Sequence, residues 1–254
     1  MTRARPLIAV RFHLASLWNW RQVYYGRIIE PVAYLLFLAA GVSGAVGASG
    51  SGTAHHYLAF VLPGMLAMLA FRSGTAAVSD VSNDRKWGVF AFYRMYGGGT
   101  TGYLLSVLIV LGGVFLLQLL VVIGLAAPLG ALSGLSGRGL LLTVAGSLLV
   151  DAGWVLAGAA VAARVQSYAT RDFVVTLTAL PVVLAAPLFY PLDTAPGYLR
   201  FVARLDPLTY QVDWLRSTWA GSAADLLWAA LWTLGTGALA VLALRAADHL
   251  TTER

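Results

Sequence analysis

The chain contains no cysteine, which excludes a disulfide framework and any metal site built on thiolates. It has a single lysine, Lys86, which is followed by Trp87. A phosphate-binding loop needs a Gly-Lys pair followed by Ser or Thr, because the lysine contacts the terminal phosphates and the hydroxyl holds magnesium. No such sequence occurs here. If ATP drives this protein, ATP and Mg²⁺ are therefore bound by a separate chain, and we expect no cofactor on this one.

Charged residues are also scarce. They make up 11% of the 254 residues, whereas a soluble domain has roughly 25%. Hydrophobic residues make up 59%, the mean hydropathy is +0.77, and the few charges separate long apolar runs, which is typical of a polytopic membrane protein. The net charge of +6 does not indicate a nucleic-acid partner, because the basic residues lie beside apolar runs rather than on one soluble face.

The apolar runs predict an all-α membrane protein with a single transmembrane domain over residues 1–254. A helix of about 20 apolar residues crosses a core of ~30 Å. Six runs meet this length, at residues 28–46, 57–79, 103–129, 139–163, 173–190 and 226–244. We expect no cleaved signal peptide, because no early apolar core is followed by a small-residue cleavage site.

The distribution of Lys and Arg predicts the orientation. With the N-terminus inside, most of these residues outside the spans fall in inner segments, at the two ends of the chain and in residues 80–102 and 164–172. This bias places both termini in the cytoplasm of a multi-pass plasma-membrane protein. Residues 1–27 combine arginines with Trp18, Trp20 and Tyr25, which predicts a cytoplasmic interfacial helix bound to membrane lipid; the alternative is a solvated basic tail.

Proline interrupts the chain between the fifth and sixth spans, on the outer side. Prolines cannot continue a straight helix, and Asp206 can cap a new helix that has Pro207 as its first residue. Residues 193–222 are therefore predicted to form a broken, re-entrant extracellular hairpin, although any membrane protein can carry a proline-broken connection. The predicted outer gate consists of Pro187, Pro191, Pro196, Asp206, Pro207 and Tyr210.

The order of motifs in this part of the chain carries a resemblance. The sequence F-Y-P-L, then P-G-Y-L, then D-P-L-T-Y-x-V-D-x-L-R before a last helix, resembles the permease subunits of type-two ABC exporters. That family includes nodulation-factor, daunorubicin-resistance (multidrug efflux) and polysaccharide export permeases. The resemblance implies a dimer of permease subunits, identical or similar, working with two ABC ATPase subunits. It also implies that this chain is a transport subunit and not an enzyme.

The resemblance implies a coupling helix in the cytoplasmic segment 80–102, which would transmit movement of the ATPase. Exposed apolar side chains beside basic residues suit docking to a partner. An ordinary charged loop is the alternative. The implied residues are Asp84, Arg85, Lys86, Trp87, Gly88 and Phe90. Three glycines, Gly97 to Gly99, stand where many relatives begin the next helix with threonine and proline, so we expect a hinge there.

Two ionisable residues lie deep within predicted spans, Arg72 and Asp151. Charges in a bilayer are paired, face a cavity or reach the surface. At ~1.5 Å per residue the depths of the two differ by only about 5 Å. We therefore predict that they pair, with snorkelling of Arg72 to the inner surface as the alternative. The pair His55-His56 lacks a third ligand nearby, so we predict no metal site.

The predicted function is export of a hydrophobic or amphiphilic substrate such as a drug, a lipid or a lipid-linked glycan. The alternative is an ion-coupled secondary transporter, which would need several acidic residues at mid-membrane, where this chain has Asp151 alone. An intramembrane enzyme is disfavoured, because no aspartate pair and no mid-span histidine is present.

Overall fold

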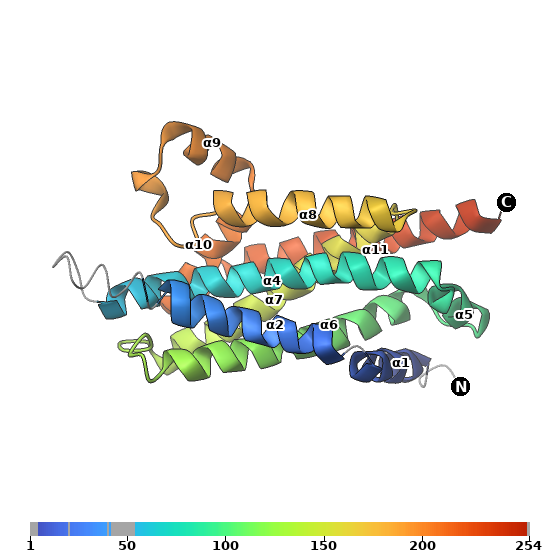
Figure 1. The fold of residues 1–254 in the computed structure, drawn as a ribbon, viewed down its shortest axis with the longest axis horizontal. Helices are drawn as coiled ribbons and strands as arrows, with labels where there is room; N and C mark the ends of the chain where they lie inside the picture. The colour runs from blue at the N-terminus through green and yellow to red at the C-terminus, as the bar shows by residue number, and fades with distance from the viewer. Residues whose placement is uncertain (1–4, 20, 40, 42–53, 253–254) are drawn as a thin grey trace.

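A computed structural model describes residues 5–19, 21–39, 41 and 54–252, and this part of the chain is helical throughout, with short connections and no strand. The long helices run side by side along one axis (Figure 1). Helix α1 (Arg5–Asn19), helix α5 (Val89–Met95) and the C-terminal end of helix α11 (Leu226–Thr252) lie at one end of the bundle, which we call the α5 end. Helices α9 (Gly197–Leu205) and α10 (Pro207–Trp219) lie toward the other end, the α9 end.

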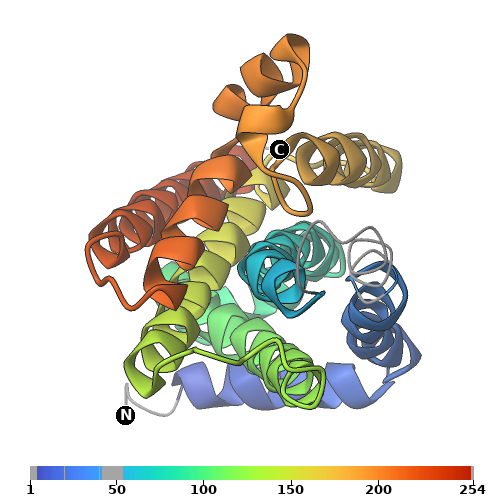
Figure 2. The same cartoon turned by 90° about the vertical axis from the view of Figure 1, so that its left-hand side faces the viewer.

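The elements follow the predicted order. They are α1 (Arg5–Asn19), α2 (Arg21–Ala33) with a π-helical turn (Tyr34–Ala39), α4 (Ala54–Lys86), α5 (Val89–Met95), α6 (Thr100–Ala126), α7 (Gly137–Ala162), α8 (Tyr168–Ala185), a 3-10 turn (Leu192–Thr194), α9 (Gly197–Leu205), α10 (Pro207–Trp219) and α11 (Leu226–Thr252). Helix α1 lies across the bundle axis, whereas α2 runs beside α4 (Figure 2). Residues 5–19 and 21–27 of the predicted interfacial segment therefore run in two different directions.

Among the described residues, five helices are long and apolar enough to cross a bilayer: α4, α6, α7, α8 and α11. They correspond to the second to sixth predicted spans. The first predicted span, 28–46, begins in α2 and continues into residues outside the described ones. This crossing, which would bring the total to six, stays a prediction.

Helices α4 and α7 cross closely at the centre of the bundle. A Cβ atom on Gly74 would stand 2.7 Å from the carbonyl oxygen of Trp154, and one on Gly158 would overlap the carbonyl of Gly74. Small residues allow this approach, which matters in lipid because no hydrophobic drive pulls helices together there. Helix α11 covers α7 on the other side, and Leu62, Phe115 and Leu215 are among the fully buried side chains.

The segment 80–102 differs from the prediction. Helix α4 continues to Lys86, so Asp84, Arg85 and Lys86 belong to the end of a span rather than to a separate short helix. Gly88 ends this helix with φ 77°, in the left-handed region that glycine adopts without strain. The short helix that follows is α5, and Gly97 with φ 74° turns the chain into α6.

Candidate functional site

The end of α4 is bonded to the ends of two other helices, at a contact that we call the α4–α7–α8 junction (Asn83, Arg85, Lys86, Trp87, Tyr168 and Arg171). Arg85 Nη1 donates to the carbonyl oxygens of Ala162 and Ala163, at 2.8 and 2.7 Å. These carbonyls end α7, where helix carbonyls lack partners and favour positive charge. The predicted coupling residue Arg85 therefore joins α4 to α7.

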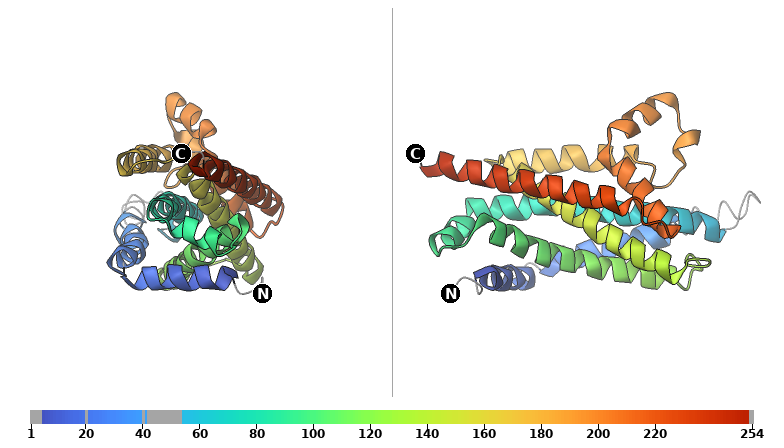
Figure 3. Two further views of the ribbon diagram at one scale, coloured as in Figure 1. Left: turned by 90° about the vertical axis from the view of Figure 1, so that its right-hand side faces the viewer. Right: turned by 180° about the vertical axis from the view of Figure 1, so that it is seen from behind.

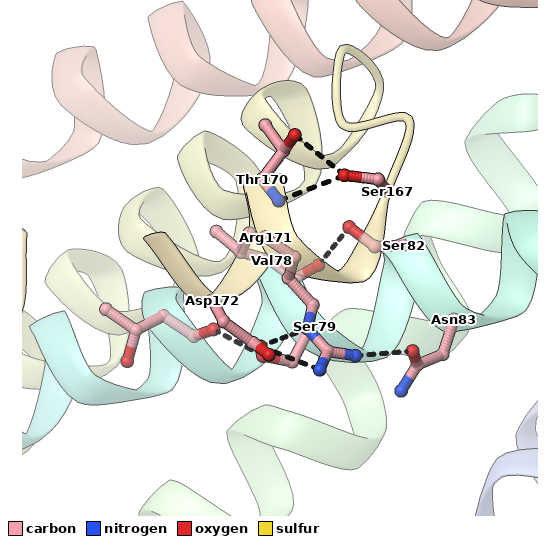
Figure 4. Close-up of polar contacts among 9 residues, drawn as sticks. Val78, Ser79, Ser82, Asn83, Ser167, Thr170, Arg171 and Asp172 are labelled. Carbon is pink, nitrogen blue, oxygen red and sulfur yellow. Dashed lines mark hydrogen bonds and ion pairs between the residues drawn. The ribbon is translucent and has the colours of Figure 1, made fainter. Parts of the chain in front are cut away.

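The junction extends to α8 through aromatic and charged groups. Lys86 Nζ lies 3.4 Å from the ring centroid of Tyr168, and Trp87 Nε1 donates to the Tyr168 hydroxyl at 2.8 Å. Arg171 Nη1 donates to Asn83 Oδ1 at 2.8 Å, and its guanidinium also bonds Asp172 (Figure 4). These bonds connect the end of α4 to the first turn of α8, as Arg85 connects it to the end of α7.

Asp84 points into the protein rather than toward solvent. Its Oδ2 accepts a hydrogen bond of 2.7 Å from the Tyr103 hydroxyl of α6, and His13 Nε2 of α1 lies 3.8 Å from the same oxygen. Burial lowers the pKa of His13 to about 4, so the imidazole is neutral at pH 7 and the contact is not an ion pair. Asp84 is thus a buried link between α4, α6 and α1.

Helix α5 presents a different apolar face from the one predicted. Phe90 is 3% exposed and packs edge-to-face on Tyr103, with ring centroids 4.8 Å apart. The outward face consists of Phe92, Met95 and Tyr96, which are 62%, 83% and 68% exposed. The correction follows from helical period, since Phe92 and Tyr96 are four residues apart and share a face that Phe90 does not. An apolar cavity of about 580 Å³ separates this helix from α1.

A polar groove runs along α4 between α2 and α8. At the α5 end it opens into a cavity of about 460 Å³ that includes Asp80 and Asn83, and it continues into a smaller one of about 170 Å³ beside Arg72. Two ion pairs bridge α2 and α4 along it. Arg27 lies 3.8 Å from Asp80, and Arg72 bonds Glu30. Sequence reasoning missed both ion pairs, because only the packing of α2 beside α4 shows which residues of the two helices face each other.

The predicted pair of Arg72 and Asp151 is wrong. Arg72 faces α2 and bonds Glu30, while Ser73, the next residue, turns toward α7 and bonds the Asp151 carboxylate. Successive side chains of a helix point about 100° apart, so two residues at a similar depth in the membrane need not face each other. Asp151 is 1% exposed, and its Oδ1 has no hydrogen-bond partner among the described residues.

The α9 end contains the predicted proline-broken segment. Asp206 Oδ1 accepts from the Leu208 amide at 2.9 Å and caps α10, with Pro207 at the first position, as predicted. Tyr210 donates to the Arg204 carbonyl at 2.8 Å. Helix α10 packs against α4 and α7, with Leu208, Val212 and Leu215 buried.

Three of the four prolines of the predicted gate lie in the connection from α8 to α9, where Pro187 is buried and Pro191 and Pro196 are exposed. Arg216 Nη2 donates to the Pro187 carbonyl at 2.6 Å, and its guanidinium lies 3.9 Å from the centroid of the Phe60 ring. The structure thus brings Pro187 to α10 and leaves the other two prolines on the surface.

Comparison with known proteins agrees with this architecture. Residues 7–219 match the model of the ABC-2 type transporter family. Nodulation protein J of Rhizobium leguminosarum bv. trifolii is 29% identical over 204 residues, covering 77% of this chain and 73% of the relative. Nodulation protein J of Rhizobium meliloti (strain 1021) is 27% identical over 236 residues, covering 82% and 84%. This multi-helix membrane chain therefore belongs to the ABC-2 type transporter family.

Proposed function

We propose that this chain is the membrane permease subunit of an ABC exporter, which receives its energy from ATPase subunits on separate chains. The observation that carries the proposal is the placement of α5. This helix holds exposed aromatic residues and follows, after a two-residue turn, the end of α4 that is bonded to α7 and α8. A push on α5 would move three helices together. The chain's single lysine, Lys86, is followed by Trp87 rather than by Ser or Thr, so the sequence contains no phosphate-binding loop.

The proposed ATPase docking surface consists of Phe92, Met95 and Tyr96 with the neighbouring face of α1. Large exposed side chains beside an apolar cavity supply the anchors that dominate binding energy at protein interfaces. In this arrangement the α5 end and both termini are cytoplasmic, which agrees with the positive charge of the inner segments.

The polar groove is the proposed substrate path. Its ion pairs offer hydrogen-bonding groups to a polar head, while the apolar stripe of α8 next to it suits a hydrophobic tail, so an amphiphile fits better than a wholly polar solute. The stripe consists of Phe173, Leu177, Leu180 and Leu184, all at least 55% exposed. A second permease copy facing α8 would enclose the groove between the two copies.

Co-expression with an ATPase tests this function. We expect the two chains to co-purify and amphiphilic substrates to stimulate ATP hydrolysis. The double variant Phe92→Ala and Tyr96→Ala should weaken assembly about 30-fold or more, because loss of an aromatic anchor costs about 2 kcal/mol. Leu231→Ala, an exposed position on α11, serves as the matched control.

A transport assay in proteoliposomes provides the result that would contradict this proposal. If the purified chain alone moved substrate on a proton gradient without ATP, the exporter proposal would be wrong and the ion-coupled alternative would replace it.

A further inference from the structure

Helix α9 stands apart from the bundle and exposes an apolar face. It projects sideways beside the end of α8, rather than capping the tip of the bundle, in every view (Figures 1, 2 and 3). Ala203 is its only buried residue. An apolar face in this position needs a covering that the described part of the chain does not provide.

The sequence of α9 divides its circumference into three sectors, at about 100° per residue. Leu199 and the buried Ala203 share the sector nearest the protein, and Arg200 and Arg204 share a second, exposed sector. The third sector spans about 100° and holds large apolar side chains that are 74%, 66%, 45% and 70% exposed: Tyr198, Phe201, Val202 and Leu205.

We propose that α9 is an anchor in the outer leaflet, with its apolar sector among acyl chains and Arg200 and Arg204 bound to phospholipid phosphates. An amphipathic helix with aromatic and aliphatic residues on one face and arginine on another binds at the headgroup boundary. Guanidinium groups bind phosphate through paired N–H donors. Helix α9 has no acidic residue to neutralise them, so its charge is complementary to an anionic lipid surface.

Lipid is a better occupant than a second copy of the chain. Four side chains fall short of the roughly 800 Å² per partner that a stable protein interface buries. The second copy proposed to face α8 therefore does not need α9, and it leaves the apolar sector of α9 to lipid. A symmetric contact would also bring the arginine sectors of two α9 helices toward each other. The anchor would fix α10 relative to the leaflet, because Tyr210 of α10 bonds the Arg204 carbonyl. The inference rests on the chain spanning a membrane and does not depend on an ATPase.

The absence of native cysteine allows a direct test by spin labelling. Phe201→Cys and Arg200→Cys would be labelled in the full chain, reconstituted in phosphatidylcholine vesicles with and without phosphatidylglycerol. We expect the label at 201 to collide mainly with oxygen, as at the lipid-facing control Leu231→Cys. We expect the label at 200 to collide mainly with a water-soluble nickel complex.

The double variant Arg200→Gln and Arg204→Gln tests the phosphate contact. Phosphatidylglycerol should draw the label at 201 deeper into the bilayer in the parent chain and have no effect in the double variant. Arg138→Gln, which replaces an exposed arginine in the first turn of α7, should behave like the parent. Equal preference of both labels for the nickel complex would overturn the anchor. Broadening of the spectrum of the label at position 201 that disappears when labelled chains are diluted with unlabelled ones would show contact with a second copy and overturn the lipid anchor. Neither result depends on transport, so each is distinct from failure of the exporter proposal.

Discussion

At each end of the bundle an arginine bonds a backbone carbonyl, but the surroundings of the two arginines differ. Arg85 bonds two carbonyls of α7 and stands within a junction of hydrogen bonds and ring contacts that also holds α8. Arg216 bonds one carbonyl, that of Pro187, and stacks on Phe60. The segment that Arg216 holds is broken by prolines and a 3-10 turn.

This difference indicates a division of labour along the bundle. Three helices tied by charge-assisted bonds move as a unit, whereas a segment with short helices and proline breaks changes its angle at its connections. For the proposed exporter, this contrast assigns the α5 end to receiving force from the ATPase and the α9 end to opening and closing. Four substitutions test this contrast.

Arg85→Ala should have the largest effect. It leaves two α7 carbonyls without their charged donor, and bonds of this type contribute about 1.5–3 kcal/mol each. We expect a lower thermal unfolding temperature in detergent and loss of substrate-stimulated ATP hydrolysis. Arg164→Ala, an exposed arginine just beyond α7, is the control. Equal unfolding temperatures for the two variants would contradict the role of the junction.

Arg216→Ala should cost less, about 2 kcal/mol. It removes one charged hydrogen bond, one ring contact and an ion pair of 3.7 Å with Asp213, and such an exposed pair contributes little. If the two ends differ as described, substrate transport falls while ATP hydrolysis continues. Arg216→Lys should recover the variant only in part, since lysine lacks the planar group that stacks on Phe60. A loss of ATP hydrolysis equal to that of Arg85→Ala would remove the contrast.

Asp206→Ala should destabilise the protein by about 1 kcal/mol through loss of the α10 cap. Burial raises the pKa of Asp206 to about 6, although the bond from the Leu208 amide opposes this. Between about pH 4 and pH 6 the folded protein holds a proton that the unfolded chain has released, so this group's contribution to stability is full below pH 4 and is lost as the pH rises to 6.

Asp206→Asn separates the cap from the titration, because the amide oxygen still accepts the Leu208 bond but does not ionise. Unfolding temperatures measured at pH 4.5 and pH 7 should lie closer together in this variant than in the parent chain. An unchanged difference would show that another group causes the pH dependence.

Trp87→Phe should have the smallest effect, about 0.5 kcal/mol, since it removes one neutral, exposed hydrogen bond to Tyr168 and keeps the ring. A double-mutant cycle with Tyr168→Phe isolates this bond. The double variant should unfold at the same temperature as Trp87→Phe. Additive losses would mean that the two residues do not interact.

The sequence predicted features that depend on local chemistry. Apolar length gave five helices that the structure contains, and the Asp206-Pro207 pair marked the start of α10 correctly. From the sequence alone we could not predict features that depend on the direction in which a side chain points from its helix. Arg72 and Ser73 are neighbours, yet one faces Glu30 and the other Asp151. Phe90 turns inward and Phe92 outward for the same reason, and the close crossing at Gly74 and Gly158 requires knowing which glycines meet.

Crosslinking from α5 tests the central claim most directly. A photoreactive group on Phe92→Cys, in the otherwise cysteine-free chain, should capture a co-expressed ABC ATPase, and the same group on Phe201→Cys at the α9 end should not. A co-purified complex in which position 92 captures no ATPase, or position 201 does, would contradict the account.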